Sequence, residues 1–202
     1  MKNIKDINVA EKRIFVRCDF NVPLSEKGVV LDDFRIKETI PTIQYLIQEG
    51  AKVILMSHLG EPKQFKSLAG GWINDPQAKE FSLEPIAKYL AKLTKRKIRF
   101  VSDCVGDKVE KEIASMKGGE VLVLENVRFY KEELSNNEEF AKEIAKNADC
   151  YVNDAFAVCH RRHASVVAIT KYLPSCAGFL LSNEIEVLEK AYTHPKKPLT
   201  IV

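Results

Sequence analysis

Short apolar runs alternate with longer amphipathic stretches along this chain. The first run, residues 13–18, is rich in β-branched and aromatic side chains and is followed by turn-forming residues. Residues 52–56 are almost continuously apolar, as is typical of parallel strands that are buried on both faces. Similar runs predict further strands at residues 98–101, 121–124 and 150–152.

Between these runs, apolar residues recur with the period of a helix. The clearest stripe comprises Ile36, Ile40, Ile43 and Ile47. It predicts a helix over residues 34–48 that begins after Asp32 or Asp33 and ends before Gly50, with Pro41 expected to bend it. Other helices are predicted at residues 82–94 (capped by Ser82), 108–116, 138–147, 166–172 and 182–192.

This order of strands and helices predicts an α/β fold. The expected architecture is a Rossmann-like, doubly wound parallel β-sheet flanked by helices on both faces, because parallel neighbours require helical crossovers. Residues 61–81 form the longest stretch without periodicity and are a candidate functional loop. After a proline-containing linker at residues 194–198, an apolar run at 199–202 predicts the start of another strand.

Composition narrows the class of protein. With 202 residues and 46% hydrophobic residues the chain can bury a core, while a net charge of +3 argues against nucleic acid or a membrane surface as a partner. Five cysteines without Cys-x-x-Cys spacing indicate reduced thiols and no metal site. Without a secretory N-terminal segment or a run of about 18 apolar residues, we expect a cytoplasmic protein.

The most distinctive stretch is residues 149–165. Its apolar strand leads through Asn153 and Asp154 to His160, Arg161, Arg162 and His163, just before a predicted helix start. Guanidinium and imidazole donors beside a helix N-terminus suit a phosphate or carboxylate. The alternative, a solvated basic loop that caps the next helix, stays open on this stretch alone.

Other polar residues follow the remaining strands. They are Asp19 and Asn21 after the first strand, His58 after the second, Arg128 after the fourth, and Arg35 at the start of the first helix. Each has an ordinary explanation as a turn residue or surface ion-pair partner. Because the carboxyl ends of parallel strands share one edge of a sheet, their joint placement predicts a ligand site there.

Six motifs in this order resemble the N-terminal half of the phosphoglycerate kinase family. They are Arg17-Cys-Asp-Phe-Asn-Val-Pro-Leu24, Asp33-Phe-Arg-Ile36, Met56-Ser-His-Leu-Gly60, Leu124-Glu-Asn-Val-Arg-Phe129, Val152-Asn-Asp-Ala-Phe156 and residues 160–165. The resemblance covers essentially the whole chain. It implies reversible phosphoryl transfer between 1,3-bisphosphoglycerate and ADP, giving 3-phosphoglycerate and ATP with Mg²⁺, by a monomer.

The resemblance also implies a role for each matching residue. Asp19 and Asn21 would hold the hydroxyl and carboxyl end of 3-phosphoglycerate, and Arg35 would stabilise charge nearest the transferred phosphoryl group. His58, Arg128 and Arg161 would bind the non-reacting phosphate. Residues 1–175 would form the phosphoglycerate-binding domain, and 176–202 the interdomain hinge helix and first strand of a nucleotide-binding domain.

Two local departures qualify the phosphate grip. Glu61 stands where the family has an arginine, and the loss of one charged hydrogen bond could weaken phosphate binding about 10-fold to 150-fold. Arg162 replaces the alanine of the family's His-Arg-Ala-His, and residues 157–159 replace Gly-Thr-Ala. We expect Arg162, or Lys63 in a loop longer than usual, to restore part of the lost positive charge.

A third departure is the extent of the sequence. It stops at Val202, where the family continues into its nucleotide domain, and it contains no Walker A or other Gly-rich phosphate loop. The chain alone is therefore expected to be inactive and to be a portion of a full enzyme. Two alternatives stay open: a stand-alone module that binds 3-phosphoglycerate or other anions, and an α/β domain whose basic edge is incidental.

Overall fold

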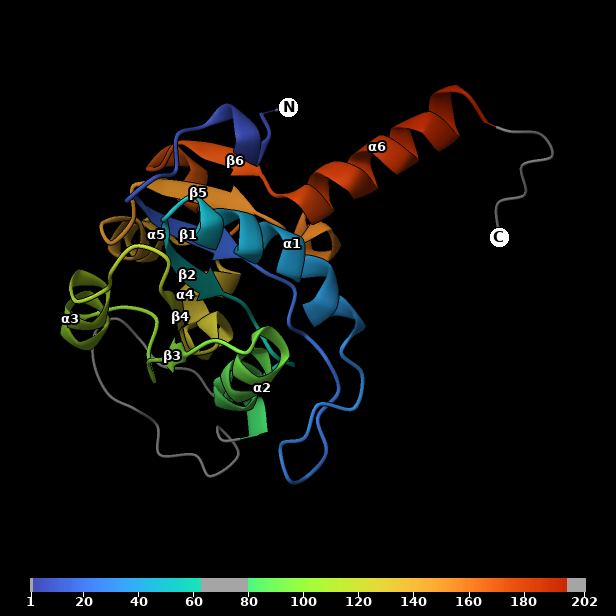
Figure 1. The fold of residues 1–202 in the computed structure, drawn as a ribbon. Helices are drawn as coiled ribbons and strands as arrows, with labels where there is room; N and C mark the ends of the chain where they lie inside the picture. Colours follow the sequence, from blue (N-terminus) through green and yellow to red (C-terminus); the bar gives the residue numbers. More distant parts are fainter. Residues whose placement is uncertain (1, 63–79, 196–202) are drawn as a thin grey trace.

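The computed structural model describes residues 2–62 and 80–195, and a single parallel sheet organises them (Figure 1). Its six strands lie in the order β3-β4-β2-β1-β5-β6. The strands are β1 (Arg13–Arg17), β2 (Lys52–Met56), β3 (Ile98–Phe100), β4 (Val121–Val123), β5 (Cys150–Asn153) and β6 (Ser175–Ala177). Because all neighbours are parallel, the loops after the strands gather at one edge.

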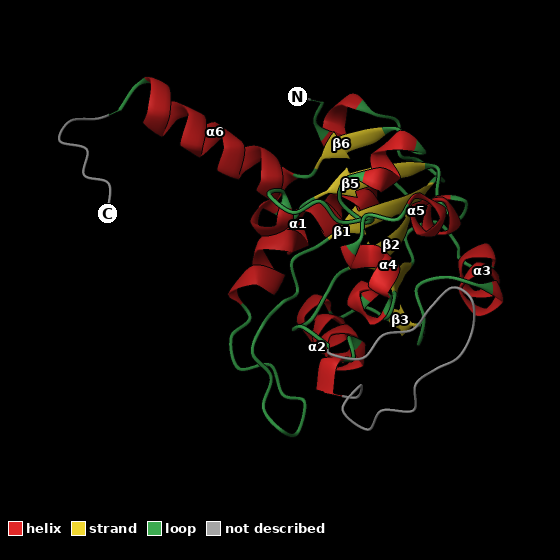
Figure 2. Cartoon of the chain, turned by 180° about the vertical axis from the view of Figure 1, so that it is seen from behind, coloured by secondary structure: helices red, strands yellow, loops and turns green. Residues whose placement is uncertain are grey.

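Helices cover both faces of this sheet. They are α1 (Phe34–Gln48), α2 (Glu84–Thr94), α3 (Asp107–Ala114), α4 (Lys131–Leu134), α5 (Glu138–Ala145) and α6 (Phe179–Thr193), with single 3-10 turns at η1 (Ile4–Asp6), η3 (Val127–Phe129), η4 (Phe156–Val158) and η5 (Ala168–Lys171). The helices α1 and α2 pack on the face seen in Figure 1, and α3 and α5 pack on the face seen in Figure 2. The doubly wound α/β fold is therefore confirmed.

Adjacent strand residues point to opposite faces and build two cores. On β2, Leu55 belongs to the core beneath α1 and α2, whereas Ile54 belongs to the core beneath α3 and α5. On β1, Val16 and Phe15 divide in the same way, and all four side chains are fully buried. Burial on both faces explains why these runs read as continuously apolar in the sequence.

Most predicted elements agree with the structure to within a few residues. The predicted bounds of α1 and β2 agree fully, and Pro41 lies inside α1. The predicted helix at 166–172 is the 3-10 turn η5, and α6 begins three residues before position 182. Lys63 and residues 199–202 lie outside the described residues.

Asp32 and Ser82 each accept a hydrogen bond from the first N–H of the helix that they were predicted to cap. The Asp33 side chain makes no capping hydrogen bond with α1, and it accepts one from Tyr89 instead, while Asp32 accepts from the Phe34 N–H. Ser82 Oγ accepts from the Glu84 N–H and donates to Glu125, so α2 itself starts at Glu84. Both helix starts are thus tied to neighbouring elements.

The strand β6 was not predicted. It forms the edge of the sheet by pairing with β5, and it leads through Gly178 into α6. The expected domain boundary after residue 175 therefore falls within β6. Beyond its first turns, α6 projects away from the sheet in both views (Figures 1 and 2), and residues 186–193 are exposed.

Candidate functional site

The loops that follow β1, β2, β4 and β5 bring a basic cluster together at the carboxyl edge of the sheet. We define this basic cluster as Arg17, His58, Arg128, Arg161 and His163. Three of its members, His58, Arg128 and Arg161, were predicted as phosphate ligands. Burial lowers the pKa of His58, and the charges of Arg17, Arg128 and Arg161 lower it further. The members of the cluster are thus close enough to interact electrostatically.

Arg17 is the most buried member of the cluster. It is the last residue of β1, and none of its surface is exposed. Its Nη2 lies 3.1 Å from His58 Nδ1, and its Nε donates to Ser165 Oγ at 3.0 Å. Burial and the nearby arginines lower the pKa of His58 to about 2, so that imidazole is neutral at neutral pH.

Ser165 links Arg17 to a buried carboxylate. Glu133 accepts from the Ser165 hydroxyl at 2.6 Å and from the Ser165 N–H at 2.8 Å. Burial raises the pKa of Glu133, and Arg17 and the hydrogen bonds from Ser165 oppose that rise. Glu133 thereby fixes the position of Ser165, and the Ser165 hydroxyl in turn orients Arg17.

Backbone and side-chain contacts position Arg128. Asn126 Oδ1 accepts from the Arg128 N–H at 3.0 Å, while Asn126 Nδ2 donates to the Leu59 carbonyl at 2.7 Å. Arg128 Nη1 donates to the Gly60 carbonyl at 2.9 Å. Within residues 2–62 and 80–195, the buried Nε and Nη2 of Arg128 have no hydrogen-bond partner. A buried guanidinium with partnerless donors favours binding of an anion.

Glu61 lies beside two of the arginines. Its Oε1 is 3.7 Å from Arg128 Nη1 and 3.9 Å from Arg161 Nη1. Burial, followed by the charges of Arg161 and Arg17, lowers the pKa of Arg128, and Glu61 partly offsets this effect. The carboxylate thus faces the positive cluster.

His163 completes the cluster on the β5 side. Its Nδ1 lies 3.8 Å from Glu133 Oε1, but burial and the charges of Arg128 and Arg161 lower its pKa to about 4. At neutral pH the ring is therefore neutral and this approach is not an ion pair. The backbone carbonyl of His163 accepts from the N–H groups of Val166 and Val167, so this residue also begins the next turn.

Asp19 and Arg35 form a second part of the site. Arg35 Nη1 donates to Asp19 Oδ2 at 2.8 Å, with Asp19 buried and the Arg35 side chain 49% exposed. Both residues line a cavity of about 410 Å³ between α1, η4 and the start of α6. The buried carboxylate therefore orients a guanidinium that can still reach a ligand.

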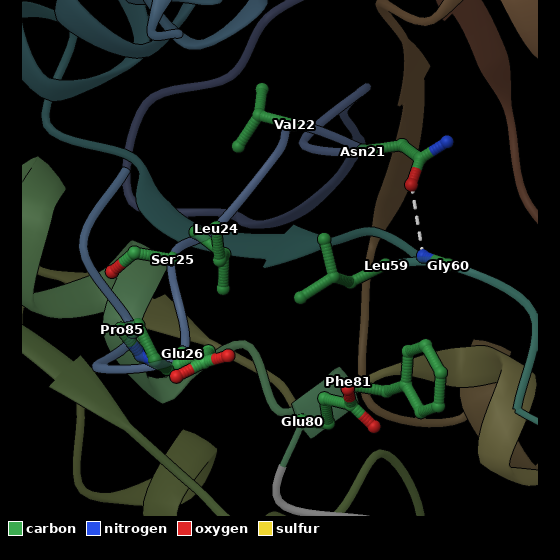
Figure 3. A pocket seen from close by; sticks show the side chains of 11 residues that line it. Asn21, Val22, Leu24, Ser25, Glu26, Leu59, Gly60, Glu80, Phe81 and Pro85 are labelled. Atoms are coloured by element: carbon green, nitrogen blue, oxygen red, sulfur yellow. Dashed lines mark hydrogen bonds between the residues drawn. The ribbon is translucent and has the colours of Figure 1, made fainter. Parts of the chain in front are cut away.

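Asn21 connects the loops after β1 and β2. Its Oδ1 accepts from the Gly60 N–H at 2.8 Å, as Figure 3 shows. Gly60 has a φ of +59°, and a Cβ there would lie 2.5 Å from the Phe81 ring, so glycine is required for this approach. The contact also borders a cavity of about 640 Å³, whose walls include Leu24, Leu59, Phe81 and Pro85.

Arg162 was predicted to contribute to the phosphate site, whereas Arg17 was not. The hydrogen bond to Glu138 raises the pKa of Lys171, and the charge of nearby Arg162 opposes this rise. Glu61, by contrast, pairs with Arg128 and Arg161. The compensating role of Arg162 stays a prediction. Arg17 was quoted in a motif but not predicted as a site residue, although a charged residue that ends an apolar strand was an available signal.

Residues 2–62 and 80–195 contain no group of three or more His, Cys, Asp or Glu side chains that could hold a metal ion. Within the same ranges, no helix has the length and apolar character needed to cross a membrane. The chemistry that this site offers is anion binding by arginines and neutral imidazoles, with oriented polar groups beside it.

Comparison with known proteins identifies the family of this chain. A family model described as phosphoglycerate kinase matches residues 4–202. The chain is 46% identical to the phosphoglycerate kinase of Dictyoglomus turgidum over 99% of its own length and 47% of that relative. It is 48% identical to the chloroplastic phosphoglycerate kinase of Volvox carteri over 100% of its own length and 42% of that relative.

A solved structure gives the same result. The crystal structure of phosphoglycerate kinase from Pyrococcus horikoshii aligns with a TM-score of 0.84 and 34% identity, over 98% of this chain and 47% of that one. The chain thus spans about half the length of the curated relatives that it matches.

Proposed function

Since this chain belongs to the phosphoglycerate kinase family, we propose that its 202 residues form the phosphoglycerate-binding half of such an enzyme. The reaction is reversible phosphoryl transfer between 1,3-bisphosphoglycerate and ADP, giving 3-phosphoglycerate and ATP. The observation that carries the proposal is the buried Arg128, whose Nε and Nη2 have no partner among the described residues, beside His58 and Arg161.

In this proposal the basic cluster holds the non-reacting phosphate. Arg128 supplies two buried donors, Arg161 supplies an exposed guanidinium, and His58 supplies a neutral ring N–H. Phosphate oxygens match the planar fork of arginine, which stays charged at all physiological pH values. Burial of the donors strengthens each of these interactions relative to water.

The opposite end of the substrate lies toward Asp19 and Asn21. Asp19 accepts from Arg35 and remains able to accept from a substrate hydroxyl, and the Nδ2 of Asn21 can donate to a carboxylate. Arg35 is the proposed charge stabiliser nearest the transferred group. Because the phosphoryl acceptor is already an ionised carboxylate, the step needs positioning and charge neutralisation rather than a strong base.

ATP or ADP with Mg²⁺ would supply or accept the phosphoryl group. We assign the nucleotide and its metal to the region that the relatives have beyond the matched half. We propose that residues 1–175 form the phosphoglycerate domain and that residues 176–202 lead toward that region, with β6 still part of the first sheet. We also propose a monomeric, cytoplasmic protein.

The test is calorimetric titration of the 202-residue chain with 3-phosphoglycerate and, separately, with sulfate. We expect saturable binding with a clear preference for 3-phosphoglycerate. Arg161→Gln should weaken that binding about 10-fold or more, because a charge-assisted hydrogen bond is worth about 1.5 to 3 kcal/mol. Arg96→Gln removes the same charge just before the amino end of β3, away from the carboxyl ends of the strands where the cluster lies. This variant should leave the affinity for 3-phosphoglycerate unchanged.

Two outcomes would count against the proposal. Equal affinity for sulfate and 3-phosphoglycerate would favour an incidental basic edge. A coupled kinase assay, with the separately produced second half of a relative added, distinguishes the enzyme from a binding module. Binding without turnover under every such complementation would favour the stand-alone module.

A further inference from the structure

Glu61 lies where a ligand anion would be expected, between the two guanidinium groups of Arg128 and Arg161. We infer that Glu61 is a built-in competing carboxylate, which faces these arginines in the free protein and must be displaced by the substrate phosphate. This inference rests on the proposed function of the basic cluster and identifies the residue that sets its affinity.

The distances indicate charge pairing without hydrogen bonding. Glu61 Oε1 lies 3.7 Å from Arg128 Nη1 and 3.9 Å from Arg161 Nη1, beyond the range in which N–H donors make useful hydrogen bonds. The carboxylate therefore neutralises part of the positive charge but leaves the guanidinium donors available. An incoming phosphate can replace it without breaking a hydrogen bond.

The burial of the partners is strongly asymmetric. The Arg128 side chain is 3% exposed, whereas that of Glu61 is 78% exposed. The backbone beside Glu61 is fixed, because the Gly60 N–H donates to Asn21 and the Gly60 carbonyl accepts from Arg128. A free side chain on a fixed backbone can turn away into solvent while the arginines stay in place.

Glu61 leaves two buried hydrogen-bond donors of Arg128 without a partner among the described residues. Its Nε and Nη2 are buried and have no hydrogen-bond partner within the described ranges, even with Glu61 present. A tetrahedral phosphate can accept from several donors at once, whereas the Glu61 carboxylate approaches one terminal nitrogen, Nη1. The ligand thus gains contacts that the internal carboxylate lacks, but it must overcome the charge of that carboxylate.

The inference predicts that Glu61→Gln tightens phosphate binding. Because the Glu61 carboxylate itself is exposed to solvent, its ion pairs are weak, and removing its charge should lower the dissociation constants of 3-phosphoglycerate and inorganic phosphate by about 3-fold to 10-fold. Glycerate has no phosphate group and should bind both proteins equally. Glu49→Gln, at the exposed end of α1 before β2, is the matched control and should leave all three constants unchanged.

Calorimetric titration of the full 202-residue chain with these three ligands gives a decisive result. If both proteins bind 3-phosphoglycerate, and the affinity of Glu61→Gln is equal to or lower than that of the wild type, the inference fails while the proposed function stands. If neither protein binds 3-phosphoglycerate or inorganic phosphate, both fail. An equal gain for glycerate would also overturn it, because the effect would not depend on the phosphate.

Discussion

At the scale of single residues, the contact between Arg17 and His58 determines where the imidazole proton lies. A guanidinium has only donors, so His58 Nδ1, 3.1 Å from Arg17 Nη2, must accept. With the pKa of His58 lowered to about 2, the ring carries a single proton at neutral pH, and that proton is on Nε2. His58 can therefore present one N–H donor to an anion.

Nitrogen-15 NMR of the histidine rings tests this assignment. At pH 7, we expect His58 to show a protonated Nε2 and an unprotonated Nδ1, without exchange between tautomers. The exposed ring of His160 serves as an internal reference for a histidine whose two tautomers exchange in solvent. A protonated Nδ1, or shifts midway between the two forms, would contradict the arrangement.

Residue-level sequence reasoning found the side chains that follow strands but missed those that support them. Asp19, His58 and Arg128 could be predicted because residues after parallel strands share an edge. Glu133 and Ser165 lie 32 positions apart and meet only in the folded chain, so no local pattern indicated their pairing. Arg17 lies within the predicted strand at residues 13–18, and its burial became visible only with the neighbouring loops in place.

At the scale of elements, Asp154 joins the end of β5 to the start of α6. Its Oδ1 accepts from the N–H groups of Leu180 and Leu181 at 3.0 and 3.4 Å. A Cβ on Gly178 would lie 2.2 Å from the same oxygen, so glycine is needed for this close approach. Burial raises the pKa of Asp154 to about 6, although these hydrogen bonds oppose the rise.

This shift predicts a specific pH dependence of stability. The folded protein holds the Asp154 proton more tightly than the unfolded chain does, where the ordinary pKa is 3.8. The stabilisation is thus complete below about pH 4 and is lost as the pH rises through about 6. A shift of about two pKa units corresponds to at most about 3 kcal/mol of unfolding free energy.

Urea unfolding of the wild type and Asp154→Asn across pH 4 to 8 measures the effect. Asparagine keeps an acceptor for the α6 N–H groups but does not titrate, and all other groups are shared. The stability of the wild type relative to the variant should fall with rising pH. Parallel curves for the two proteins would show that Asp154 is not the group responsible.

The accuracy of the predicted elements followed their length and burial. The five-residue strand β2 and the fifteen-residue helix α1 could be predicted fully, because each has a strong apolar pattern. The strand β6 has only three residues and follows Pro174, which left no period to detect. Its pairing with β5 is a tertiary contact, which no local pattern in the sequence indicates.

At the scale of the whole molecule, one sheet separates two cores and should make them unfold together. Ile54→Ala and Leu55→Ala remove neighbouring β2 side chains from opposite cores. Each should lower the unfolding free energy by about 2 to 5 kcal/mol within a single transition. Near-ultraviolet and far-ultraviolet circular dichroism should give the same midpoint for each variant.

A control on α6 makes this prediction selective. Val187→Ala alters a side chain that is 57% exposed on the projecting part of the helix, and it should change the unfolding free energy by less than about 0.5 kcal/mol. Two separate transitions in Ile54→Ala or Leu55→Ala would mean that the two faces unfold independently.

The projection of α6 has a mechanical consequence. Its first turn is packed at Leu181 and held by Asp154, whereas residues 186–193 are exposed. A helix of 15 residues is about 22 Å long, so a rotation of about 10° at its packed end would move its far end by about 4 Å. The helix is thus a lever arm whose fulcrum lies beside the cavity of Asp19 and Arg35, and a small change there is amplified along its length.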